Sequence, residues 1–175
     1  MIAIVLFGCA KEGFSVDSID ISRTISATVD TDGILSDITE TASISSVISP
    51  SDKKYTFRLV SPDEDLVWEG EMNGGRRTSE ELLITPGASF PEGEYSVIIY
   101  SEEGLTYSDN LVLPSTDLSN IPYLDSTGNL INGKGSDVLY YFGDKETENK
   151  DSAEYAVIVY GDRYGNIIRL RSELI

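Results

Sequence analysis

Residues 90–100, FPEGEYSVIIY, decide the expected fold. The run 95–100 is apolar on both faces of an extended chain, which is typical of a strand at the centre of a sheet. Residues 102–104 (EEG) then favour a turn, and a second β-prone run, 105–113, ends at Pro114. We therefore expect two adjacent strands joined by a short turn.

On both sides of this pair, apolar and polar residues alternate with period two, and turn residues separate the runs. Arg23 interrupts the apolar face of the first run. Segment 34–48 fits helical spacing at some positions, but its Ser, Thr and β-branched content favours one or two strands. Short strands at such regular spacing indicate an all-β sandwich over 18–114. The seven expected strands cover 18–30, 41–48, 55–60, 65–72, 81–85, 94–101 and 105–113.

Within 18–114 the chain resembles an immunoglobulin or fibronectin type III-like domain. The resemblance is carried by Trp68 on an early strand and by residues 90–95, which lead into an apolar strand. It implies that Tyr95 forms a tyrosine corner, in which the hydroxyl ties a crossover to the sheet edge. The chain has one cysteine, so the disulfide-bonded antibody subtype is excluded. Such a resemblance concerns the fold and carries no activity.

Residues 115–175 are too few for a second full sandwich, so we expect a small β-rich appendage. Its expected elements are hairpins around 125–129 and 161–165 and a β-prone run at 138–142. Residues 94–100 (EYSVIIY) and 154–160 (EYAVIVY) agree at five of seven places. Duplication and chance reuse of common strand residues both explain this internal similarity.

The charge of the chain excludes several classes of function. Its 175 residues carry 13 Lys+Arg and 30 Asp+Glu, a formal net charge of −17. Binding to nucleic acid or to anionic lipid requires a basic surface, so both are disfavoured. The chain has no histidine, which removes imidazole triads and His-ligated metals, and its single cysteine removes thiolate clusters. We expect no cofactor and no bound metal.

The N-terminus carries the most specific motif. An apolar run, 2–7, precedes Gly8 and Cys9, and this pattern resembles the lipobox of bacterial lipoproteins, with Leu6 at the third place before the cysteine. The resemblance implies that the Cys9 thiol receives a diacylglycerol and that the signal is cut before it. Phe7 is bulkier than the family usually has there, although spirochaete lipoboxes accept such residues.

Two features depart from a complete signal peptide. No Lys or Arg precedes the apolar run, and that run is shorter than the ~7–15 residues of a signal core. We infer that translation starts upstream of Met1. The alternative is a buried first strand over 2–7 with Cys9 as a small apolar residue. The expected organisation is a signal remnant at 1–8, a tether at 9–17, a sandwich at 18–114 and an appendage at 115–175.

Two groups of residues are candidates for contact with a partner. Arg76 and Arg77 form a basic pair in a loop predicted to be flexible, and such a pair suits an acidic partner or a glycan. Tyrosine combines apolar area with a polar tip and suits recognition surfaces. Tyr140, Tyr141, Tyr160 and Tyr164, near the C-terminus, are therefore predicted to share a contact face, although strand packing also explains them.

The acidic residues do not identify a reaction. Residues 30–33 (DTDG) are reminiscent of a calcium loop, but Thr28 and Thr39 occupy the first and twelfth ligand places, so a simple turn is expected. With 30 carboxylates, some pair always lies at a glycosidase separation. We expect a cell-envelope lipoprotein, periplasmic or surface-exposed, that binds or scaffolds without catalysis. The alternatives are a carbohydrate-active enzyme or its accessory, and a secreted domain without lipid.

Overall fold

The computed structural model describes residues 13–85 and 87–174. These residues form fourteen β-strands and one short 3-10 helix, η1 (Lys150–Ser152). The all-β fold predicted from sequence periodicity is confirmed.

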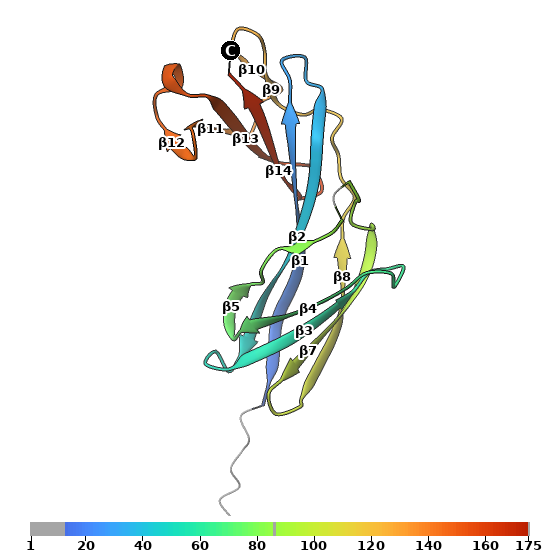
Figure 1. Ribbon diagram of the computed structural model, residues 1–175. Helices are drawn as coiled ribbons and strands as arrows, with labels where there is room; N and C mark the ends of the chain where they lie inside the picture. The colour runs from blue at the N-terminus through green and yellow to red at the C-terminus, as the bar shows by residue number, and fades with distance from the viewer. Residues whose placement is uncertain (1–12, 86, 175) are drawn as a thin grey trace, which may run out of the picture.

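Two long strands, β1 (Ser15–Val29) and β2 (Leu35–Ser49), form an antiparallel hairpin that runs the length of the molecule (Figure 1). Each has 15 residues and spans about 50 Å at ~3.3 Å per residue. Asp30 makes the turn between them, because its Oδ1 accepts from the backbone N–H groups of Asp32 (2.9 Å) and Ile34 (2.8 Å). The ambiguous segment 34–48 is therefore part of one continuous strand.

The lower half of this hairpin forms one layer of a β-sandwich. In this half of the hairpin, the C-terminal part of β2 pairs with β5 (Gly75–Thr78) and β6 (Leu82–Leu83). The second layer is a four-stranded sheet in the order β4-β3-β7-β8. Its strands are β3 (Lys54–Val60), β4 (Val67–Asn73), β7 (Gly93–Ser101) and β8 (Thr106–Leu113). Leu59, Val97 and Ile99 lie fully buried between the layers.

Tyr95 forms the predicted corner. Its hydroxyl donates to the carbonyl oxygen of Pro91 at 2.6 Å, which fastens the crossover into β7. The side chain is fully buried, and this burial raises the pKa of Tyr95 to about 12, while the Arg23 charge acts in the opposite direction. The phenol therefore stays neutral and keeps its hydrogen bond through the physiological pH range.

The C-terminal strands extend the first sheet instead of forming a sheet of their own. The last strand, β14, pairs in parallel with the upper half of β1, through registers such as Ile25 with Ile168. The sheet then runs β12-β11-β13-β14-β1-β2-β5. These C-terminal strands are β11 (Asp137–Phe142), β12 (Lys145–Thr147), β13 (Tyr155–Gly161) and β14 (Ile167–Glu173). A short hairpin, β9 (Tyr123–Leu124) with β10 (Leu130–Ile131), precedes them.

This upper region, which we call the distal unit, has its own core. Ile158, Ile168 and Leu170 are fully buried there, and Ile121 and Leu124 from the connection after β8 cover the same face. The chain leaves the sandwich at β8, close to the expected boundary at 114. Because β1 and β2 contribute to both cores, the two units share a sheet.

Candidate functional site

Arg76 and Arg77 lie on a strand, which corrects the prediction of a flexible loop. Both belong to β5, where Arg77 pairs with Ser46 and Arg76 with Val47 of β2. Gly75 adopts a φ of 82°, a conformation that favours glycine, and it turns the chain back onto β2 directly after β4. Both arginine side chains are exposed at one edge of the large sheet, so this edge carries a fixed pair of positive charges.

The four candidate tyrosines do not form one surface. Tyr140 and Tyr160 are half-buried and pack against the distal core. Burial raises the pKa of Tyr160 to about 12, with Asp162 and Asp117 adding to the effect. Tyr164 lies in the β13–β14 turn, where the Arg163 guanidinium sits 4.7 Å from its ring centre. A contact of these residues with a partner stays a prediction.

Tyr141, the fourth candidate, lies on the opposite, outer face of the distal sheet together with Tyr155. Tyr141 and Tyr155 are cross-strand neighbours whose rings stack in parallel, with centres 5.2 Å apart. The Arg171 guanidinium lies 3.8 Å from the Tyr155 ring centre, and its Nε donates to Glu173 at 2.7 Å. Tyr155 was not among the residues predicted from the sequence. The pattern that could have indicated it is the apolar character of both faces of β13.

The internal similarity of 94–100 and 154–160 does not extend to orientation. In β7, Tyr95, Val97 and Ile99 point into the sandwich core. The equivalent places in β13, Tyr155, Val157 and Val159, are only half-buried, because Ala156 and Ile158 take the inner positions instead. A shift of one residue moves every side chain of a strand to the other face. Equivalent side chains of the two matching sequences therefore lie in the sandwich core in β7 and on the outer side of the sheet in β13.

A groove with aromatic lining lies at the open side of the sandwich. Its volume is about 540 Å³, and it runs between β4 and β6. The Trp68 ring stacks on Phe90 at 5.4 Å, and its Nε1 donates to the carbonyl oxygen of Leu83 at 3.0 Å. Half of the other residues that line the groove are acidic, namely Glu69, Glu71, Glu80 and Glu81; the rest are Phe57, Gly70, Leu82 and Leu83. The groove thus places an indole among carboxylates.

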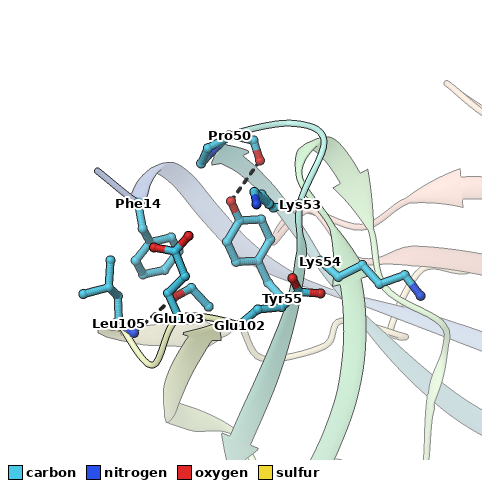
Figure 2. A pocket seen from close by; sticks show the side chains of 9 residues that line it. Phe14, Pro50, Lys53, Lys54, Tyr55, Glu102, Glu103 and Leu105 are labelled. Carbon is cyan, nitrogen blue, oxygen red and sulfur yellow. Dashed lines mark hydrogen bonds between the residues drawn. The ribbon is translucent and has the colours of Figure 1, made fainter. Parts of the chain in front are cut away.

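A smaller hollow lies at the end of the sandwich where β1 begins (Figure 2). Its volume is about 30 Å³, enough for one or two waters. Phe14 stacks on Tyr55 at 5.4 Å, and the Tyr55 hydroxyl donates to the carbonyl oxygen of Pro50 at 2.9 Å. Burial raises the pKa of Tyr55, with nearby carboxylates adding to the effect. This packing holds the start of β1 against the sandwich.

Several acidic residues stabilise turns. Asp125 and Asp162 repeat the arrangement of Asp30, because each Oδ1 accepts from the N–H groups two and four residues later. Hydrogen bonds, first that from the Thr127 hydroxyl, lower the pKa of Asp125 to about 2. Within 13–85 and 87–174, no group of three or more acidic or cysteine side chains is arranged to hold a metal ion.

The lipobox residues Leu6, Phe7, Gly8 and Cys9 lie outside the described residues. Among the residues that the structure describes, no helix has the length and apolar character needed to span a membrane. Comparisons with known proteins identify no relative, since no family model, curated protein or solved structure matches the chain. The proposed function is therefore inferred from this chain's own residues.

Proposed function

We propose that this chain is a lipid-anchored lipoprotein of the bacterial cell envelope whose β-rich body acts as a binding or scaffolding module, without catalysis. The observation that carries the proposal is the motif Leu6-Phe7-Gly8-Cys9 after an apolar run. Two acyl chains suffice for a stable anchor, since each buried methylene contributes about 0.8 kcal/mol. The body of charge −17 then needs no basic patch to stay at a membrane.

The shape of the body suits an anchored module. The chain enters β1 at the end of the sandwich, and the Phe14–Tyr55 stack holds that entry in place. The distal unit lies at the other end of the 15-residue hairpin (Figure 1). An anchor just before Gly13 would therefore place the sandwich near the membrane and the far end of the hairpin, within the distal unit, about 50 Å further out. Protein or glycan partners would meet the exposed edges and the distal unit.

Lipidation is tested by detergent phase partitioning of the protein expressed in a diderm bacterium. We expect the wild-type product to enter the detergent phase and the Cys9→Ser variant to stay in the aqueous phase, because the serine hydroxyl does not accept the diacylglycerol. Intact mass spectrometry should find a wild-type N-terminus at Cys9 carrying acyl chains. A free Cys9 thiol with residues 1–8 retained would contradict the proposal and favour the secreted or strand alternatives.

The Trp68 groove favours one second candidate, a carbohydrate-binding or carbohydrate-cleaving function that uses paired carboxylates. Glu69 and Glu71 lie within ion-pair distance of Arg58 (3.7 Å) and Lys54 (3.8 Å), so Glu80 and Glu81 are the carboxylates available to a sugar. Glycosidases place such a pair of carboxylates beside the bond that they cleave.

This second candidate predicts that the full chain is retarded in affinity gels containing soluble β-glucan or xylan. A Glu80→Gln/Glu81→Gln variant should lose the retardation about tenfold, since each carboxylate–hydroxyl bond contributes ~1–2 kcal/mol. Glu102→Gln, outside the groove, is the matched control. Release of reducing sugar by wild-type protein alone would indicate catalysis, and no retardation in either gel would exclude the candidate.

A further inference from the structure

The outer face of the distal sheet is unusually apolar for a surface that neither core covers. We define this outer face by the outward side chains of β11, β13 and β14, namely Asp137, Leu139, Tyr141, Tyr155, Val157, Val159, Ile167, Arg169, Arg171 and Glu173. An antiparallel sheet with one solvated face normally alternates apolar and polar residues. In β13, however, Val157 and Val159 on the outer side are as apolar as Ala156 and Ile158 on the buried side.

The charges of the outer face differ from those of the whole protein. It carries two arginines and two carboxylates and has no net charge, whereas the chain as a whole is at −17. Arg171 already pairs with Glu173. Arg169 forms no ion pair with any residue in 13–85 or 87–174, and it is exposed. The face therefore presents one cation, Arg169, and one carboxylate, Asp137. It suits a partner whose contact surface also carries no net charge.

The strand register makes this face complementary to itself. Asp137, Val159 and Arg169 lie in one row across β11, β13 and β14. A two-fold axis parallel to β13 exchanges β11 and β14, so Asp137 of one copy meets Arg169 of the other at two symmetric places. The same operation sets Val157 against its own symmetry mate, Leu139 opposite Arg171 and Tyr141 opposite Glu173. An isologous contact requires such a self-complementary pattern.

We propose that two copies of this chain associate through the outer face, with their distal sheets packed face to face. Sheets that pack in this way lie about 10 Å apart, with strands within about 30° of each other, which lets the Val157 and Val159 side chains of the two copies interdigitate. Two Asp137–Arg169 pairs would then flank an apolar centre. This proposal goes beyond the lipoprotein assignment and does not depend on it.

Sedimentation velocity of the full chain in reducing buffer, over a range of concentrations, tests the association directly. We expect a concentration-dependent monomer–dimer equilibrium. Asp137→Arg and Arg169→Asp should each weaken the dimer at least about tenfold, because each sets like charges against each other at two places. The double variant Asp137→Arg/Arg169→Asp should restore association, since it exchanges the partners without changing the net charge.

Matched charge changes elsewhere separate this contact from general repulsion. Asp20→Arg on the sandwich part of β1 changes the charge as Asp137→Arg does, and Lys53→Asp in the turn between β2 and β3 changes it as Arg169→Asp does. Both controls should dimerise like wild type. A wild-type chain that sediments as a monomer at every concentration overturns the proposal. The proposal is also overturned if the double variant associates no better than the single variant with the lower affinity. That result would indicate association through another surface.

Discussion

Replacing Glu40 by leucine is expected to lower the free energy of unfolding by about 3–5 kcal/mol, because it leaves a guanidinium buried without its counter-charge. Arg23 is 2 % exposed and lies at the junction of the two cores. Its Nε is 3.9 Å from Glu40 Oε2, and its Nη2 donates to the carbonyl oxygen of Phe90 at 3.4 Å. Glu40 also accepts from the Phe90 N–H at 3.0 Å. The loss would be measured by urea denaturation followed by circular dichroism.

The double variant Arg23→Met/Glu40→Leu is expected to be more stable than Glu40→Leu alone, since it removes the buried charge together with its partner. Glu69→Leu is the exposed control. Its ion pair with Arg58 spans 3.7 Å at the surface, so its loss should cost no more than about 1 kcal/mol. If Glu40→Leu cost no more than Glu69→Leu, the buried pair would not be a determinant of stability.

Arg23 also shows which structural features can be predicted from the sequence and which cannot. Its position in an otherwise apolar alternation is visible in the sequence and marks a special place in β1. Its partners are not visible, because Glu40 is brought to it by the β1–β2 register and Phe90 by the β6–β7 connection. The division into two cores at Arg23 is equally a result of pairing between distant segments.

The strands themselves were predictable because a buried strand face imposes its own period on the sequence. The Tyr95 corner was expected from the immunoglobulin-like resemblance, and the hairpins around 125–129 and 161–165 follow from Asp and Gly. The parallel pairing of β1 with β14 was not predictable, because it joins the two ends of the chain and no local residue encodes it. Register between distant strands is decided by packing.

The candidate surfaces were harder to predict for a related reason. Tyr140 and Tyr141 are neighbours, and only the choice of inner face decides which of them packs on the core. Strand β13 is apolar on both sides, so its pattern does not reveal that choice. Arg76 and Arg77 were predicted to lie in a loop because the preceding residues, Asn73-Gly74-Gly75, are typical of a turn. The chain after that turn instead pairs with β2.

Truncation of a core residue in either unit is expected to destabilise both units together. Leu59 and Ile158 are fully buried in the sandwich core and the distal core, respectively. Leu59→Ala and Ile158→Ala should each cost about 2–5 kcal/mol, because each removes buried methyl groups and leaves a cavity. Val112→Ala, at a side chain that is 66 % exposed, is the control and should cost less than about 0.5 kcal/mol.

The form of the unfolding transition matters as much as its midpoint. Strands β1 and β2 supply Ile44 and Ile48 to the sandwich core and Ile25 and Val29 to the distal core, so neither core survives when the hairpin unfolds. Both variants should therefore give a single transition, with coincident curves from tryptophan fluorescence, which reports Trp68 in the sandwich, and from far-ultraviolet circular dichroism, which reports every strand. If Ile158→Ala separated the two curves, the distal unit would unfold alone, and the shared hairpin would connect the cores without coupling them.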